Sequence, residues 1–212
     1  MGREFLDIFE EWADSYDKTV EGHDLQYKEV FEGYEEILTM VCERSSGTIW
    51  EFGSGTGNLS AKLVQKGYNV IGIEPSKEMR AVFQKKFGES ISVVDGDFLS
   101  YSVDGKPDTI VSTYAFHHLT DTEKAQAFHQ YGNLLNKGGK IVFADTMYLS
   151  SQAYSDGIEK AEKQGFEDLA QDLKREHYTT IPALTQMAEE AGFSVTFIRC
   201  NAFVWLMEAI KQ

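Results

Sequence analysis

Residues 50–60 read WEFGSGTGNLS, a hydrophobic strand that runs into a glycine-rich turn and then into a helix. Gly53, Gly55 and Gly57 remove Cβ atoms where the turn is tight, and the N-terminus of the following helix offers N–H groups to a carboxylate or a phosphate. The dinucleotide-binding fingerprint G-x-G-x-x-G has its third glycine one residue later, at the position of Asn58. The turn therefore predicts a ligand-binding α/β fold and leaves the kind of ligand open.

From residue 48 onward, short β-branched runs alternate with longer amphipathic segments. This alternation is typical of a mostly parallel sheet covered by helices. The runs are hydrophobic almost throughout, as expected of strands that are buried on both faces. The predicted strands are TIWEF (48–52), NVIGI (69–73), ISVV (91–94), DTIVSTY (108–114) and KIVFAD (140–145).

The helices predicted between these strands have their own start and stop signals. Ser, Thr and Pro favour the first positions of a helix, and Gly favours the position just after its end. The predicted helices are 58–66, ended by Gly67; a helix capped by Ser76 that runs to Phe87; a helix that starts with the capping-box pair Thr120 and Glu123 and ends at LLNKGG; and a helix from Pro182 to Gly192.

The C-terminal segment contains two further strand candidates, VTFIR (195–199) and FVWLMEAI (203–210). Only residues 200–202 separate them, which is too short for a helical crossover. The two strands are therefore predicted to pair antiparallel, as a hairpin.

Two regions lie outside the alternation. Residues 5–42 have apolar side chains at helical spacing, which predicts a helical cap ahead of the first strand. Residues 150–177 are charged and helical in character, with interruptions expected at Gly157 and Gly165, and predict an insertion over the carboxyl ends of the sheet. The expected layout is one domain over residues 1–212: cap (1–45), ligand-binding core (46–145), helical insertion after the fifth strand (146–180), and C-terminal helix and hairpin (181–212).

Composition and charge exclude several classes of protein. The 212 residues include 34 acidic and 20 basic side chains, a net charge of −14, which disfavours nucleic acid as a partner. No stretch approaches the roughly 20 apolar residues of a membrane span, and the N-terminus lacks the apolar run of a signal peptide. Cys42 and Cys200 form neither a disulfide framework nor a zinc motif. We expect a soluble cytoplasmic protein that does not bind membranes.

Acidic residues follow the second and third predicted strands. Glu74 stands 17 residues after Gly57, where its carboxylate can accept hydrogen bonds from both hydroxyls of a ribose. Asp97 and Phe98 follow the third strand, where a carboxylate can bind the exocyclic amine of adenine and an aromatic ring can supply an apolar face. Together with the glycine turn, they predict an adenosine pocket without a diphosphate. Two structural roles stay open: Asp97 as a turn former and Gly57 as a site of close helix packing.

On these residues the chain resembles the class I S-adenosylmethionine (SAM) dependent methyltransferases. The resemblance covers nearly the whole chain, and FEEWADSYD, IEPSKEMR and STYAFHHL look more closely like the small YrrT-type methyltransferases of bacilli. The motifs that carry it are E-x-G-x-G-x-G at 51–57, Glu74, the D-F pair at 97–98, STYAFHHL at 112–119 and LLNKGGKIVFAD at 134–145.

This resemblance implies a Rossmann-like seven-stranded sheet, mostly parallel, with the last strand antiparallel. It implies SAM as cofactor, with Gly53 at the methionine part, Glu74 at the ribose and Asp97 at the adenine. Gly55 and Phe98 belong to the same predicted cofactor site, and Glu51 is expected to support the glycine turn. The N-terminal pair Tyr16 and Asp17 would lie near the methionine end of SAM.

The predicted reaction is methyl transfer to a small-molecule acceptor by in-line displacement, for which positioning supplies most of the catalysis. A base is useful only if the acceptor must lose a proton. His117 and His118 follow the fourth strand and are the candidate catalytic residues, with His117 favoured; a buried, hydrogen-bonding histidine is the alternative. Asp145, Tyr148, His177 and Tyr178 border the insertion and are candidates to line the acceptor site.

The sequence favours three alternative interpretations less. A metal at His117 and His118 is not expected, because adjacent residues usually point different ways and no third ligand has suitable spacing. An NAD(P)-dependent reductase is disfavoured by the early third glycine and by the absence of a Tyr-x-x-x-Lys pair. A SAM-binding regulator or pseudoenzyme would keep the cofactor residues and lack an acceptor pocket.

The acidity is concentrated at one end of the chain. Residues 1–44 contain 13 acidic and 4 basic side chains, so this segment carries −9 of the total −14. Because SAM is net cationic, an acidic rim can favour its entry; the alternative is a solvated helix face that aids solubility.

Overall fold

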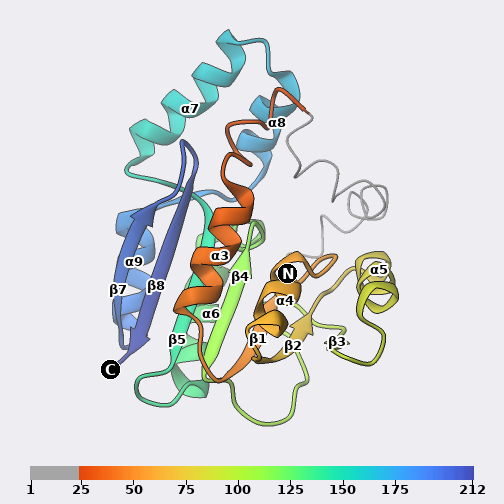
Figure 1. Cartoon of the computed structure of the whole chain (residues 1–212). Coiled ribbons are helices and arrows are strands. Elements are labelled where there is room, and N and C mark those ends of the chain that lie inside the picture. The colour runs from red at the N-terminus through yellow and green to blue at the C-terminus, as the bar shows by residue number, and fades with distance from the viewer. Residues whose placement is uncertain (1–23) are drawn as a thin grey trace.

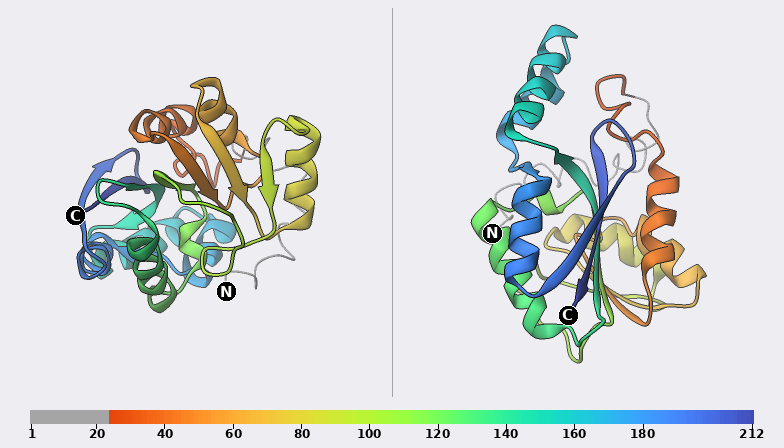
Figure 2. Two further views of the ribbon diagram at one scale, coloured as in Figure 1. Left: turned by 90° about the horizontal axis from the view of Figure 1, so that it is seen from below. Right: turned by 90° about the vertical axis from the view of Figure 1, so that its left-hand side faces the viewer.

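A computed structural model gives the structure of residues 24–212, a mixed α/β sheet with helices on both faces (Figures 1 and 2). Strands β1 to β5 run parallel, and β8 runs antiparallel to both of its neighbours. The predicted sheet, mostly parallel with an antiparallel last strand, is therefore confirmed. Its order is β3 (Ser92–Val94), β2 (Asn69–Ile73), β1 (Thr48–Phe52), β4 (Thr109–Thr113), β5 (Lys140–Tyr148), β8 (Val204–Lys211) and β7 (Phe193–Arg199).

An additional short strand, β6 (Thr179–Thr180), pairs with the end of β5 outside this seven-stranded path. Helices α3 and α4 cover one face of the sheet, and α6 and α9 cover the other (Figure 2). The helices are α3 (Tyr34–Arg44), α4 (Asn58–Gln65), α5 (Lys77–Phe87), α6 (Asp121–Leu134), α7 (Ser151–Lys163), α8 (Glu167–Arg175) and α9 (Ile181–Glu190), with a 3₁₀ turn η2 (Phe116–His118).

The predicted helix signals act locally as expected. The Ser76 hydroxyl accepts a hydrogen bond from the Met79 N–H at the start of α5. Thr120 and Glu123 form a reciprocal capping box at the start of α6. Because these side chains satisfy N–H groups that a helix leaves unpaired, they fix where each helix begins.

The C-terminal hairpin closes one side of the sheet. Strands β7 and β8 pair antiparallel from Phe193 opposite Lys211 to Arg199 opposite Trp205, which confirms the predicted hairpin. Strand β8 also pairs with β5, where Trp205 lies opposite Asp145. This pairing buries β5 in the middle of the sheet and fixes the backbone at Asp145.

The insertion consists of α7 and α8, which extend beyond the sheet (Figure 1). Gly165 separates the two helices, but the interruption expected at Gly157 is wrong, because Gly157 lies inside α7. A Cβ atom at Gly157 would stand 3.2 Å from the Tyr148 ring. Glycine therefore allows α7 to pack closely on β5, and packing outweighs its low helix propensity.

Part of the predicted cap lies against this insertion. The side-chain amide of Gln26 donates to Asp168 at 2.8 Å, and the Tyr27 hydroxyl donates to Asp172. Burial, together with the hydrogen bond to Asp172, raises the pKa of Tyr27. The predicted N-terminal pair, Tyr16 and Asp17, lies outside the described residues. Within residues 24–212, no helix combines the length and the apolar character needed to span a membrane.

Candidate functional site

The glycine turn after β1 has the left-handed backbone that its sequence predicts. Gly53, Gly55 and Gly57 have φ values of +64°, +52° and +88°. A Cβ atom at Gly53 would stand 2.6 Å from the Cβ of Ala115, so the turn lies directly against the residue that precedes η2. At Gly55 no heavy atom lies within 4 Å of the Cβ position, and the turn is open there.

Gly57 has a different neighbourhood. A Cβ atom there would stand 2.3 Å from the Phe87 ring and 2.8 Å from the Phe83 ring, both in α5. The structure therefore shows close helix packing at Gly57, which is the structural role that the sequence left open for this residue. Glu51, in β1, is 2% exposed and accepts a hydrogen bond from the Ser60 hydroxyl in α4. Burial raises the pKa of Glu51 to about 8.

Glu74 closes the glycine turn. One carboxylate oxygen accepts the Gly55 N–H at 2.8 Å, and the other accepts the Ser76 N–H at 2.8 Å. Burial raises the pKa of Glu74, while these two N–H groups favour its ionised form. Arg80 donates to the Glu74 carbonyl oxygen at 2.6 Å. Glu74 is therefore held in place by backbone donors, and its carboxylate oxygens still have lone pairs for further donors.

Asp97 follows β3 and closes its own turn. Its Oδ1 accepts the Leu99 N–H at 3.0 Å and the Ser100 N–H at 2.8 Å, which is the turn-forming role named as an alternative. The Phe98 ring is 6% exposed and stacks on Phe52, with ring centroids 5.6 Å apart. The expected roles of Asp97 and Phe98 at adenine stay predictions.

Buried polar atoms lie beside the turn. Among residues 24–212, the Ser54 and Ser112 hydroxyls are buried without a hydrogen-bond partner. Ser112 Oγ stands 4.0 Å from the Cβ position of Gly53. Because buried polar groups are normally hydrogen-bonded, these hydroxyls are unused donors and acceptors beside the turn. We call Gly53, Gly55, Glu74 and Asp97 the glycine-loop edge.

The two histidines lie in η2, just after β4, and each has its own carboxylate. His117 Nδ1 stands 2.7 Å from Asp145 Oδ1, and the His117 N–H donates to Asp145 Oδ2 at 3.0 Å. Burial works to lower the pKa of His117, but Asp145 outweighs it and the net shift is upward. Burial likewise works to raise the pKa of Asp145, and His117 reverses that shift. His117 and Asp145 therefore form a charge-assisted pair.

His118 pairs with Glu176, at the C-terminal end of α8. Its Nδ1 stands 2.9 Å from Glu176 Oε2, and the two histidine rings lie 4.2 Å apart. Burial, and then the charge of His117, lower the pKa of His118. We call His117, His118, Asp145 and Glu176 the histidine edge.

The insertion holds this edge through residues 176–178. The His177 N–H donates to the His117 carbonyl oxygen at 3.0 Å, and the Tyr178 ring stacks on the His117 ring at 4.9 Å. Lys124 is almost fully buried, and its ammonium donates to the carbonyl oxygens of Leu119 and His177. Three of the four candidates to line the acceptor site, Asp145, His177 and Tyr178, thus contact His117, and their role at the acceptor stays a prediction. No motif in the sequence marks Glu176 or Lys124.

The same edge contains a set of possible metal ligands. Among the described residues, one ligand atom each from His117, His118 and Glu176 lie within 4.8 Å of one another. The third ligand could not be recognised from sequence spacing, because Glu176 stands 58 residues after His118.

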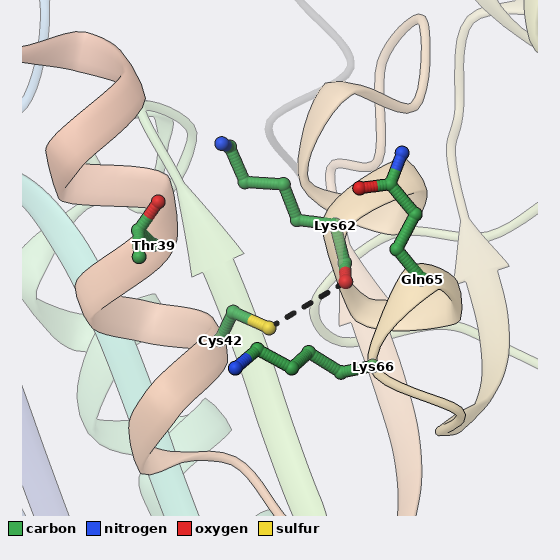
Figure 3. A pocket seen from close by; sticks show the side chains of 5 residues that line it. All are labelled: Thr39, Cys42, Lys62, Gln65 and Lys66. Atoms are coloured by element: carbon green, nitrogen blue, oxygen red, sulfur yellow. Dashed lines mark hydrogen bonds between the residues drawn. The ribbon is translucent and has the colours of Figure 1, made fainter.

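A separate cavity of about 290 Å³ lies between α3 and α4 (Figure 3). It is lined by Thr39, Cys42, Lys62, Gln65 and Lys66. Lys62 pairs with Glu35 at 2.8 Å, and the Cys42 thiol donates to the Lys62 carbonyl oxygen. The cavity adjoins the C-terminal end of α4, whereas the glycine turn precedes the N-terminal end. It contains none of the predicted site residues.

The sequence matches known proteins along its length. Residues 22–197 match the model of a methyltransferase domain family. An uncharacterized methyltransferase of Geobacillus sp. strain WCH70 is 56% identical, and one of Anoxybacillus flavithermus is 58% identical. Both alignments cover all of this chain and all of the relative.

Solved structures share the fold at low sequence identity. Magnesium protoporphyrin IX methyltransferase from Synechocystis with bound SAM has a TM-score of 0.67 and 15% identity, over 98% of this chain and 97% of that one. Its complex with SAH has a TM-score of 0.71 and 17% identity, over 97% of this chain and 99% of that one. From the family model and the full-length relatives, the chain belongs to the methyltransferase domain family.

Proposed function

We propose that this protein transfers a methyl group from SAM to a small-molecule acceptor by in-line displacement. Its family uses a methyl donor, and structures that it resembles hold SAM or the demethylated product SAH. The single observation that carries the proposal is the glycine turn closed by Glu74: the Gly55 N–H binds the Glu74 carboxylate, and the space beside Gly55 is open.

The residues at this edge suit the parts of SAM. Gly53 and Gly55 give a backbone without side chains for the methionine part. Glu74 is oriented by two N–H groups, so that its remaining lone pairs can accept the ribose hydroxyls. Asp97 and Phe98 would contact the adenine, and Tyr16 would lie at the methionine end.

The histidine edge would hold the acceptor. SAM supplies a sulfonium-bound methyl group, and the protein positions a nucleophile in line with it. His117 and His118 are 13% and 14% exposed, beneath the end of the insertion, which suits a small molecule better than a polymer. Together with the net charge of −14, this supports a cytoplasmic enzyme for a small metabolite rather than for nucleic acid.

Calorimetry with the full chain tests the cofactor site. We expect SAM and SAH to bind with micromolar affinity and NAD not to bind. Glu74→Ala and Asp97→Ala should each weaken SAH binding by about 10- to 100-fold, because each removes a charged hydrogen-bond acceptor. Asp104→Asn, on an exposed turn, is the matched control and should leave SAH affinity unchanged. Unchanged affinity in both alanine variants would discard this site, and binding of NAD in place of SAH would favour the reductase.

Turnover separates an enzyme from a SAM-binding regulator. The protein is incubated with methyl-labelled SAM and fractionated metabolite extracts, and labelled products are identified by mass. We expect one acceptor class to be methylated, and mutation of Glu74 to abolish the labelling. SAH binding without labelling of any fraction would favour the regulator.

A further inference from the structure

We propose that His117, His118 and Glu176 form a binding site for a divalent transition metal ion of the Zn²⁺ type. The three residues come from η2 and from the end of α8, so the site exists only once the insertion has docked on the sheet. Its ligands belong to the histidine edge, where the proposed function places the acceptor, but none of them belongs to the glycine-loop edge, so that metal binding and SAH binding can be tested separately.

The spacing of the three groups fits such an ion. Two ligand atoms that each stand about 2.1 Å from a tetrahedral Zn²⁺ lie roughly 3.4 Å apart. In the structure, His118 Nδ1 and Glu176 Oε2 stand 2.9 Å apart, and all three ligand atoms lie within 4.8 Å of one another. These separations bracket the required one. Small side-chain movements would therefore complete the site without a change of the backbone.

Asp145 prepares His117 for this role. It engages His117 Nδ1 at 2.7 Å, which leaves Nε2 as the ring nitrogen for a metal. Asp145 is itself held by the N–H groups of His117 and Thr146, at 3.0 and 2.7 Å. Metal-binding histidines almost always donate their other ring N–H to a carboxylate or carbonyl, which fixes the ring and its tautomer. Asp145 is therefore a positioning residue for the site.

The charge of the cluster favours a cation. Asp145 and Glu176 are buried carboxylates, and Lys124 is the one almost fully buried cation among the described residues that contacts this edge. Arg175 also approaches Glu176, at 3.4 Å, but its side chain is 42% exposed and pairs with Asp172. Asp121, which faces Lys124, is 56% exposed. With both imidazoles neutral, as metal ligands must be, Asp145, Glu176 and Lys124 together carry one excess negative charge.

Two imidazoles and one carboxylate select the kind of ion. Imidazole suits Zn²⁺, Fe²⁺, Co²⁺ and Ni²⁺, whereas Mg²⁺ and Ca²⁺ prefer oxygen ligands. Three protein ligands leave at least one coordination position open, as in catalytic zinc sites. An oxygen or sulfur atom of the acceptor would suit that position, next to the proposed methyl donor.

Metal titration of the full chain tests the site. After treatment with a chelator, the protein is titrated with Zn²⁺ in a calorimeter and with Co²⁺ under visible absorption. We expect one Zn²⁺ per chain and a Co²⁺ absorption band typical of a four- or five-coordinate site. His118→Asn and Glu176→Gln should lower Zn²⁺ affinity by at least about 100-fold, and Asp145→Asn by about 10- to 100-fold.

His129→Asn is the matched control, because His129 is an exposed histidine of α6 and should leave both signals unchanged. SAH binding, measured on every variant, reports whether the chain is folded. If the chelator-treated wild-type protein binds SAH but takes up no Zn²⁺ and gives no Co²⁺ band, the metal proposal is overturned and the proposed methyl transfer still stands. Equal Zn²⁺ affinity in the wild-type protein, His118→Asn and Glu176→Gln would overturn it as well.

Discussion

The glycine-loop edge and the histidine edge both follow carboxyl ends of parallel strands, but different kinds of contact hold them. At the glycine-loop edge, Glu74 binds the backbone N–H of Gly55, 19 residues earlier, and Asp97 binds N–H groups two and three residues later. At the histidine edge, His117 and His118 bind side chains 28 and 58 residues away. The first edge depends on local backbone and the second on the docking of an insertion.

The two edges therefore place different requirements on the sequence. A backbone donor is available whatever the side chain, so the glycine-loop edge requires only glycines and two acids. The histidine edge requires four matched side chains from three elements, with Lys124 and Tyr178 supporting them. Substitutions should therefore act on backbone conformation at the first edge and on charge and ligand geometry at the second.

Gly53→Ala is expected to have the largest effect at the glycine-loop edge. The new Cβ would stand 2.6 Å from the Cβ of Ala115, at a φ of +64° that disfavours alanine. We expect SAH affinity, measured by calorimetry, to fall by at least about 100-fold, which is about 2.7 kcal/mol.

The control for that change is Gly67→Ala. Gly67 also has positive φ, at +86°, but no heavy atom lies within 4 Å of its Cβ position. It should cost about 1 kcal/mol of stability and leave SAH affinity unchanged. If both alanine variants bound SAH like the wild-type protein, backbone geometry would not be what defines this edge.

Glu51→Gln should change how stability depends on pH. Burial raises the pKa of Glu51 to about 8 in the folded chain, against about 4.3 in an unfolded chain. Between these values the folded state keeps a proton that the unfolded state releases, so stability falls as pH rises. We expect the advantage of Glu51→Gln in unfolding free energy to grow by about 3 to 4 kcal/mol from pH 5 to pH 8, measured by urea unfolding.

The exposed Glu89→Gln serves as the comparison, with no pH-dependent advantage expected. An advantage of Glu51→Gln that is the same at pH 5 and pH 8 would mean that the carboxyl under the glycine turn is ionised in the folded chain.

The smallest expected effect is on the rate of cofactor entry. Residues 1–44 carry a net charge of −9, and SAM is net cationic. If this acidity steers the cofactor, raising salt from 50 to 500 mM should slow SAM association by about two- to five-fold in stopped-flow measurements, and slow SAH less. If the association rates of SAM and SAH depended on salt in the same way, the acidic segment would have no steering role and would be only a solvated surface.

Most of the fold was predictable because its signals are local. The capping residues Ser76 and Thr120 act within four residues of their own positions, and the short gap before β8 permits only a hairpin. Gly157 misled the prediction because its role depends on Tyr148, which lies on another element. Helix propensity depends on the residue itself, so it does not include a contact with a residue on another element.

The candidate site divides in the same way. Glu74 could be predicted because a strand end, a turn and an acid at fixed spacing form one unit. Glu176 and Lys124 could not be predicted, because no sequence motif around them indicates which residues they contact.

By itself, the sequence determined the alternation of strands and helices, the glycine turn and the acids at its edge, because hydrophobic periodicity and backbone freedom are properties of neighbouring residues. Only the tertiary structure decided that His117 and His118 each have a carboxylate, and that His117, His118 and Glu176 meet within the reach of one metal ion. Such a meeting depends on how the insertion packs over β5, and side-chain distances of this kind are fixed only by the folded core.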